Sequence, residues 1–277
     1  MNSINCRGRL LHFDQPRIMG ILNTTPDSFF SGSRTASLEA VVERAGKLLE
    51  QGAAIIDIGG QSTRPNAERV AAEEEAERVL PAIEAVAHHF PEAIISIDTF
   101  YATVALGAVE RGAAIVNDVS AGSLDAALLP TVAKLGVPYV LMHMQGNPQN
   151  MQQAPQYNNV VLDVFDYLNF RMAELQAMGI KDIIVDPGFG FGKTAAHNFE
   201  LMARLEYFQQ LGHPLLVGIS RKGMVYRTLG ISADDALNGT TVLHTVSLMK
   251  GAQILRVHDV AEAVQAVRLV AALNGEL

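Results

Sequence analysis

Eight short apolar runs recur along the chain, and longer stretches with helical spacing of their apolar residues lie between them. The runs are RIMGIL (17–22), AAIIDI (53–58), AIISID (93–98), AAIVND (113–118), VPYVLM (137–142), DIIVD (182–186), PLLVGI (214–219) and AQILRV (252–257). Nearly continuous apolar character over this length is typical of parallel strands that are buried on both faces. The pattern therefore predicts eight strands of a parallel sheet.

The intervening amphipathic stretches predict helices that cover this sheet. They include residues 37–52, 68–90, 124–136, 160–179 and 259–275. Eight strand and helix units in 277 residues match an α/β protein with the TIM (β/α)8 barrel fold. No linker rich in Pro, Gly or Ser divides the chain, so we expect one domain over residues 1–277, with residues 1–16 forming a hairpin that closes the lower end of the barrel.

Composition and charge narrow the class of protein. Apolar residues make up 49% of the chain, yet no apolar run approaches the roughly 18 residues that span a bilayer. The first 13 residues lack the apolar core of a signal peptide, and the single cysteine, Cys6, has no partner for an internal disulfide. We therefore expect a cytoplasmic enzyme. The formal charge of −8 argues against a nucleic-acid binder, so any anionic ligand requires a local group of positive side chains.

Polar residues follow the apolar runs, where the active sites of TIM barrels lie. They are Asn23, Asp57, Asp98, Asn117, Asp118, His143, Asp186, Ser220, Arg221, Lys222, Arg256 and His258. At any one position a turn-forming role explains the residue equally well. Polar residues at the ends of all eight predicted strands favour an active site.

The second predicted strand places Asp57 on the face opposite its isoleucine neighbours, because side chains alternate along a strand. Asp57 is therefore expected to point into the barrel mouth, the region at the carboxyl ends of the strands. The loop that follows offers two hydroxyls and a guanidinium, from Ser62, Thr63 and Arg64. These groups suit an anionic, oxygen-rich ligand such as phosphate.

The last two predicted strands are followed by a local group of basic residues, in SRK (220–222) and RVH (256–258). This is the region where TIM barrels often bind phosphate. The alternative interpretation is a set of surface charges paired with helix acids. The alternation of Arg256 and His258 on one strand favours an anion site.

Asp98, Asn117 and Asp186 form a second set of strand-end residues. Their carboxylate and amide groups match the edge of a flat heterocycle that carries N–H donors and ring-nitrogen acceptors. A polar network that only stabilises the barrel mouth is the alternative, and the spacing does not decide between the two.

GFGFGKT (188–194) resembles a phosphate-binding P-loop but fails the required spacing. Only three residues separate Gly188 from Gly192, where the motif needs four. We therefore do not expect nucleotide hydrolysis, and we interpret the glycines as flexibility in the long loop after the sixth predicted strand.

Taken together, the strand-end segments resemble the dihydropteroate synthases, of the pterin-binding TIM-barrel family. The segments are MGILNTTPDSF, DIGGQSTRP, SIDT, VNDVSAG, MHMQG, DPGFGFGK, GISRKGM and RVHDV, in the order of the family, and they cover nearly the whole chain. The resemblance implies the condensation of 6-hydroxymethyl-7,8-dihydropterin pyrophosphate with p-aminobenzoate in folate biosynthesis, assisted by Mg²⁺. It also implies a homodimer formed through the last helices and a target for sulfonamides.

The resemblance further implies roles for individual positions. The residues expected to bind the pterin are Asp98, Asn117, Asp186 and Lys222. Those expected to bind pyrophosphate are Asn23, which would also bind Mg²⁺, Ser62, Thr63, Arg256 and His258. Those expected to bind p-aminobenzoate are Thr63, Arg64, Pro65, Phe191 and Ser220, together with the first loop, Thr25 to Ser28. The expected catalytic residues are Asp57, Lys222, Asp186 and Arg64.

The chain departs from the family pattern at a few loop positions, none of which carries an assigned role. Gln61 replaces a glutamate, Asn66 replaces a glycine, Phe100 and Tyr101 stand where a lysine is common, and residues 30–32 replace Ser-Asp-Gly. Two alternatives remain open. A methyltetrahydrofolate corrinoid methyltransferase has no need of the S-T-R-P, S-R-K and R-V-H segments. A non-catalytic pterin-binding paralogue would be expected to have lost its site residues.

Overall fold

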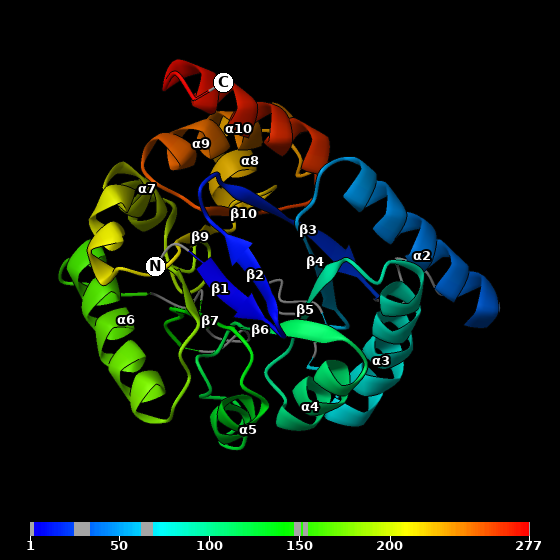
Figure 1. Ribbon diagram of the computed structural model, residues 1–277. Coiled ribbons are helices and arrows are strands. Elements are labelled where there is room, and N and C mark those ends of the chain that lie inside the picture. The colour runs from blue at the N-terminus through cyan, green and yellow to red at the C-terminus, as the bar shows by residue number, and fades with distance from the viewer. Residues whose placement is uncertain (1–2, 25–33, 62–68, 147–150, 152–154, 277) are drawn as a thin grey trace.

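A ring of parallel strands surrounded by helices forms the body of the molecule in the computed structural model, which describes residues 3–24, 34–61, 69–146, 151 and 155–276 (Figure 1). Within these residues eight strands form one sheet, in the order β8-β7-β6-β5-β4-β3-β10-β9. Val185 and Leu215 make a further parallel bridge between the two edges of this sheet. The prediction of an eight-stranded TIM barrel is confirmed.

The strands lie within the eight apolar runs or extend them by one residue. Their bounds are β3 (Arg17–Asn23), β4 (Ile55–Gly59), β5 (Ile94–Asp98), β6 (Ala113–Asp118), β7 (Tyr139–Met142), β8 (Ile183–Asp186), β9 (Leu216–Val217) and β10 (Ile254–Val257). β9 is shorter than its run of residues 214–219. Pro214 contributes its carbonyl, which accepts from the Val185 N–H at 2.9 Å, but it has no N–H of its own for a ladder bond.

Helices cover the outside of the barrel on all sides (Figure 1). Their bounds are α2 (Arg34–Glu50), α3 (Ala72–His89), α4 (Ala102–Glu110), α5 (Leu128–Leu135), α6 (Val160–Ala177), α7 (Ala195–Ala203), the 3-10 helix η1 (Leu205–Leu211), α8 (Gly223–Leu229), α9 (Leu237–Met249) and α10 (Val260–Leu273). The sequence pattern did not single out α4. Six of its nine residues are buried, so it lacks the polar face that reveals a surface helix.

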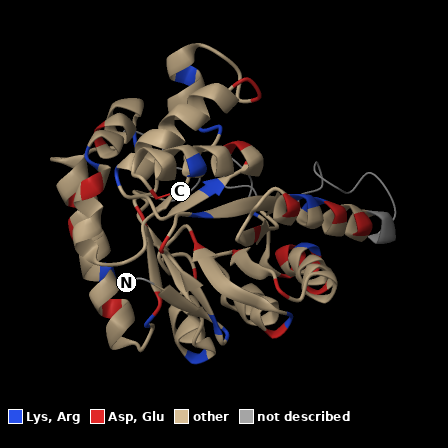
Figure 2. Cartoon of the chain, turned by 45° about the horizontal axis from the view of Figure 1, so that its top comes forward, with Lys and Arg blue, Asp and Glu red and all other residues tan. Residues whose placement is uncertain are grey.

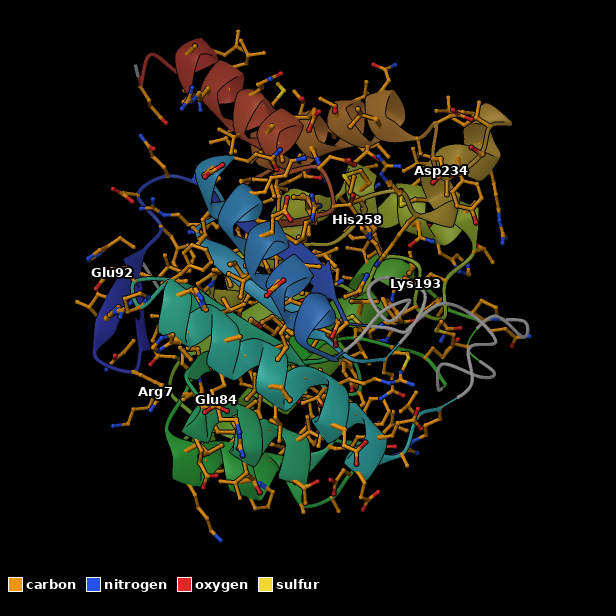
Figure 3. The ribbon with its side chains drawn as sticks, turned by 90° about the vertical axis from the view of Figure 1, so that its right-hand side faces the viewer. Arg7, Glu84, Glu92, Lys193, Asp234 and His258 are labelled. Atoms are coloured by element: carbon orange, nitrogen blue, oxygen red, sulfur yellow. The ribbon has the colours of Figure 1, made fainter. Side chains whose placement is uncertain are left out.

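The N-terminal residues form a hairpin at one end of the barrel. β1 (Ser3–Cys6) and β2 (Arg9–His12) pair antiparallel, and they lie across one end of the strands (Figures 1 and 3). Ile4, Cys6, Leu11 and Phe13 pack there against inward-pointing strand residues such as Met19 and Ile55. The hairpin therefore covers the apolar interior at the amino ends of the strands and leaves the carboxyl ends open for chemistry.

Acidic and basic residues both occur on the outer helices, separated by longer uncharged stretches (Figure 2). Within the described part of the chain, no helix has both the length and the apolar character needed to cross a membrane.

Candidate active site

Asp57 stands at the centre of the barrel mouth. Its neighbours Ile56 and Ile58 belong to the core between strands and helices, whereas Ile55 packs inside the barrel. Asp57, two residues after Ile55, therefore points inward one layer above it, and the predicted orientation is confirmed. The Asp57 carboxylate is fully buried, and its Oδ2 accepts from Asn117 Nδ2 at 3.0 Å.

Arg256 joins two carboxylates of the mouth. Its Nε lies 2.7 Å from Asp57 Oδ2, and its Nη2 lies 2.6 Å from Asp98 Oδ2. These residues come from β10, β4 and β5, three strands that converge at their carboxyl ends. One guanidinium therefore serves two carboxylates. Among the residues that the structure describes, Asp57 Oδ1 is buried without a hydrogen-bond partner, which leaves an acceptor for a ligand.

Asp98 and Asp186, two further carboxylates at strand ends, are also poorly solvated. Burial raises the pKa of Asp98 to about 7, with the Arg256 guanidinium opposing the rise and the Asp57 carboxylate adding to it. Burial likewise raises the pKa of Asp186, against the opposing charge of Lys222. Asp186 accepts from the Gly188 N–H at 2.7 Å. Carboxyls whose pKa values are raised in this way are typical of functional sites.

Lys222 completes the mouth at the start of α8. Its Nζ donates to the Phe189 carbonyl at 2.5 Å and lies 4.5 Å from the centre of the Phe191 ring. Burial lowers the pKa of Lys222 to about 8, although the carboxylates of Asp186 and Asp98 hold the charge in place. The pKa of Lys222 therefore lies close to neutral pH.

Ser220 and His258 lie together beside Arg256. Ser220 Oγ is 3.0 Å from His258 Nδ1, and the backbone N–H of His258 donates to the same oxygen at 3.2 Å. Arg221 does not join them, because its guanidinium turns to Asp259 and forms two bonds of 2.8 and 2.9 Å. The prediction of a basic cluster therefore holds for Lys222 and Arg256, and it is wrong for Arg221. Adjacent residues after a strand point in different directions, and Arg221 instead joins α8 to α10.

Two other strand-end residues are engaged in structural contacts. Asp118 accepts from the Tyr139 hydroxyl at 2.7 Å and from the backbone N–H groups of Ser120 and Gly122. His143 Nδ1 lies 2.8 Å from the Nζ of Lys193, a buried lysine of the GFGFGKT segment. At Asp118 the turn-forming interpretation of a strand-end residue is the right one.

The glycines of GFGFGKT adopt fixed left-handed conformations. Gly188, Gly190 and Gly192 have φ of +71°, +84° and +62°. The chain is mostly buried here and folds tightly against the loop after β7, so a left-handed backbone and a close approach explain these glycines. A Cβ on Gly188 would stand 1.9 Å from the His143 carbonyl oxygen, and one on Gly192 2.4 Å from that of Gln145.

Two of the departures from the family pattern, at Gln61 and at Phe100 with Tyr101, make contacts next to residues 62–68. Gln61 Nε2 donates to Glu75 at 2.7 Å, while its Oε1 accepts from the Val70 N–H at 3.2 Å. The Arg69 guanidinium lies 4.7 and 5.0 Å from the ring centres of Phe100 and Tyr101. Gln61 and Arg69, the residues on either side of 62–68, are therefore each held by contacts that involve these replacements. Sequence patterns did not reveal them, because each joins distant parts of the chain.

Some predicted site residues, and some departures from the family pattern, lie outside the described part of the structure. These are Ser62, Thr63, Arg64, Pro65, Asn66, the first loop from Thr25 to Ser28, and residues 30–32. Asn23 ends β3 with an exposed side chain, and its backbone pairs in register with Gly59 of β4. Phe191 is buried within an apolar group that also contains Phe100, Val119, Met142 and Met151.

A (β/α)8 barrel whose strand ends gather Asp57, Asp98, Asp186, an arginine and a lysine is an enzyme scaffold with a site for a small polar heterocycle. The family described as pterin binding enzyme matches residues 19–258. The dihydropteroate synthase of Escherichia coli K12 is 44% identical over 96% of this chain and 94% of its own length. The chain belongs to the pterin binding enzyme family and, within it, to the dihydropteroate synthases.

Solved structures agree with this assignment. The Yersinia pestis dihydropteroate synthase, solved with a sulfonamide drug, has a TM-score of 0.93 and 40% identity over 99% of both chains. The Xanthomonas albilineans enzyme, solved with 4-aminobenzoic acid, has a TM-score of 0.92 and 41% identity over 99% of this chain and 98% of that one.

Proposed function

We propose that the barrel mouth condenses 6-hydroxymethyl-7,8-dihydropterin pyrophosphate with p-aminobenzoate, forming 7,8-dihydropteroate and pyrophosphate for folate biosynthesis. The observation that carries this proposal is the shared guanidinium of Arg256 between Asp57 and Asp98. Two carboxylates on one cation leave an excess negative charge. Such a site favours a ligand with N–H donors and a reaction in which positive charge develops.

The pterin ring fits the second set of strand-end residues. Asp98 and Asp186 offer acceptors for ring and exocyclic N–H groups, and Asn117 supplies an amide that both donates and accepts. Lys222 supplies a donor to a ring acceptor beside them. The partner-free Oδ1 of Asp57 would face the pterin methylene, where positive charge grows as the carbon–oxygen bond to pyrophosphate breaks.

The leaving pyrophosphate is expected on the side of Arg256 and His258, together with Asn23, Ser62 and Thr63. Ser220, which is assigned to p-aminobenzoate, has its Oγ 3.0 Å from His258 Nδ1. In this arrangement the Arg256 guanidinium and hydrogen-bond donors would meet the growing negative charge of the leaving group.

The side chains of the barrel mouth suit a magnesium ion that is bound mainly by the pyrophosphate. Among the described residues, no group of three or more His, Cys, Asp or Glu side chains could hold a metal ion. Asn23 presents an exposed amide oxygen at the end of β3. Mg²⁺ commonly binds through one or two protein oxygens, phosphates and water. We therefore assign Asn23 as its protein ligand, and the ion would neutralise the charge of the leaving pyrophosphate.

The p-aminobenzoate is expected between the Phe191 ring and the segment with Thr63, Arg64 and Pro65, close to Ser220. The arylamine nitrogen would attack the pterin methylene and lose a proton as the new carbon–nitrogen bond forms. Arg64 would pair with the benzoate carboxylate. Because a sulfonamide has the outline of p-aminobenzoate, we expect sulfonamides to compete for this site.

The assembly and compartment are further parts of the proposal. Leu229, Val242, Met249, Leu269 and Leu273 are each more than half exposed, and their helices α8, α9 and α10 lie together at the top of Figure 1. Exposed apolar residues on neighbouring helices favour a partner surface, so we propose a homodimer formed there. The free thiol of Cys6 is buried, which suits the reducing cytoplasm.

Product formation tests the proposed reaction. Purified protein is mixed with the dihydropterin pyrophosphate, p-aminobenzoate and Mg²⁺, and the products are identified by mass spectrometry. We expect dihydropteroate, with none formed when p-aminobenzoate is omitted. Binding of the pterin without any dihydropteroate would contradict the proposal and identify the chain as a non-catalytic pterin-binding paralogue.

A further inference from the structure

Lys193, the lysine of the GFGFGKT segment, is 2% exposed. Its Nζ lies 2.8 Å from His143 Nδ1 and donates to the carbonyls of Gly188 at 2.9 Å and Phe191 at 3.0 Å. The carbonyl of His143 lies 3.3 Å away. A buried lysine with a full set of acceptors is costly to desolvate, so these contacts point to a specific role.

The acceptors of Lys193 belong to two different loops of the mouth. His143 follows β7, and residues 188–192 follow β8. Burial and the neighbouring charge of Lys193 lower the pKa of His143 to about 2, so the imidazole is neutral and its Nδ1 can accept. The Nζ of Lys193 thus fastens the loop after β8 to the loop after β7.

The fastened loop carries groups that hold Lys222. Phe189 offers the carbonyl that accepts from Lys222 Nζ at 2.5 Å, and the Phe191 ring lies 4.5 Å from the same nitrogen. Lys193 bonds the carbonyls on either side of Phe189, at Gly188 and Phe191. In Figure 3 Lys193 lies toward the end of the barrel that is remote from the β1–β2 hairpin.

Removing the Lys193 Nζ would take its N–H donors from the carbonyls of Gly188 and Phe191. The Gly188 carbonyl would keep the Phe191 N–H at 3.1 Å, but the buried Phe191 carbonyl would lose the donor that Lys193 gives it. A buried carbonyl that loses its donor is costly, so residues 188–192 would shift until the Phe191 carbonyl found another donor. Such a shift would displace the Phe189 carbonyl and the Phe191 ring, both of which contact Lys222. Displacement of a reacting or binding group by about 1 Å can reduce a rate about 100-fold.

We propose that Lys193 is a positioning residue for the condensation, because its buried Nζ fixes the loop whose Phe189 carbonyl and Phe191 ring hold Lys222 at the barrel mouth. This inference rests on the proposed function of the mouth. It gives the lysine of GFGFGKT a role that differs from the phosphate binding of a P-loop lysine, since its Nζ points inward to backbone carbonyls.

Lys193→Met tests the inference, because methionine keeps the aliphatic stem and removes the donor. Lys134→Met is the matched control, since Lys134 is exposed on α5. We expect kcat/KM for p-aminobenzoate to fall about 100-fold in Lys193→Met, with both a higher KM and a lower kcat, and to stay unchanged in the control. Lys193→Gln retains an amide NH2 donor group on a shorter side chain, and its kcat/KM is expected to lie between the values of wild type and Lys193→Met. Lys193→Gln also replaces Lys193→Met as the test variant if Lys193→Met does not fold.

A double-mutant cycle with Phe191→Leu separates positioning from general stability. If Lys193 acts through this loop, the double variant loses less than the product of the two single losses. Losses that multiply, or kcat and KM within about threefold of wild type in folded Lys193→Met, would overturn the inference while the proposed function stands. If the wild-type protein itself forms no dihydropteroate, the proposed function fails, and the inference falls with it.

Discussion

Lys222 and Arg256 carry the positive charge of the mouth, and each is held by groups that a substrate would also contact. Arg256 bonds Asp57 and Asp98, and Lys222 bonds the Phe189 carbonyl. Because one guanidinium pairs with two carboxylates, the loss of Arg256 would leave both carboxylates without their shared cation. The site therefore depends on individual side chains to an extent that the fold does not.

Lys222→Ala is expected to reduce turnover about 1,000-fold without unfolding the protein, because it removes the donor that we propose for the pterin. In the wild type, kcat/KM for the pterin substrate should fall as pH rises through about 8, where the Lys222 ammonium loses its charge. Steady-state assays between pH 6 and 10 measure both effects, with Lys134→Ala as the exposed control. Turnover near the wild-type rate in Lys222→Ala would rule out its assignment to the site.

Glu75 makes stability depend on pH. Burial raises its pKa in the folded protein from 4.5 to about 7. Its favourable contribution is therefore complete below pH 4.5 and is lost as pH rises through about 7, where the folded state must carry a buried charge. We expect Glu75→Gln to raise the free energy of unfolding at pH 8 by about 1 to 3 kcal/mol, with little gain at pH 4.5.

Urea denaturation at the two pH values measures this difference. Glu84→Gln is the matched control, because Glu84 lies on the same helix with its side chain 71% exposed. An equal effect of Glu75→Gln at both pH values would show that titration of Glu75 does not govern the change.

The N-terminal hairpin is an element whose two faces can be compared directly. Leu11 is 7% exposed and packs inside the barrel, whereas its neighbour Leu10 is 60% exposed. We expect Leu11→Ala to reduce the free energy of unfolding by about 2 to 4 kcal/mol and Leu10→Ala by less than about 0.5 kcal/mol. Urea denaturation measures both. Equal losses would mean that the hairpin does not close the barrel through Leu11.

The loop after β8 offers a second comparison. Gly188 and Gly212 have nearly the same φ, +71° and +70°, but only Gly188 meets a backbone atom where a Cβ would stand. Gly212→Ala is expected to cost about 1 kcal/mol from its left-handed conformation. Gly188→Ala should cost at least about 2 kcal/mol more and also lower kcat/KM. Equal stabilities of the two variants would contradict the close approach of the two loops.

The sequence predicts elements and contacts with unequal success. Buried parallel strands have continuous apolar runs, so all eight runs proved to contain strands. Strand ends identified Asp57 and Arg256, because topology alone brings those ends together. Lys193 and its contact with His143 could not be predicted, since residues 50 apart in the chain meet there. Arg221 was misinterpreted because the direction of a side chain after a strand is not encoded in spacing.

At the level of the whole molecule, the exposed apolar residues of α9 and α10 bear on assembly. Leu269 and Leu273 are 67% and 75% exposed on α10. We expect the wild type to sediment as a dimer and Leu269→Asp with Leu273→Asp to sediment as a monomer, because burying two carboxylates in an apolar contact is costly. Leu162→Asp, on the distant helix α6, is the control. A monomeric wild type would contradict the proposed interface.

The most direct test of the whole account is the ratio of pyrophosphate released to dihydropteroate formed by the purified protein with Mg²⁺. A mouth that directs the pterin methylene to the arylamine should give a ratio of one, and release should stop when p-aminobenzoate is withheld. Pyrophosphate release that continues without p-aminobenzoate, or that exceeds the dihydropteroate formed, would show that water is the nucleophile and would contradict the proposed reaction.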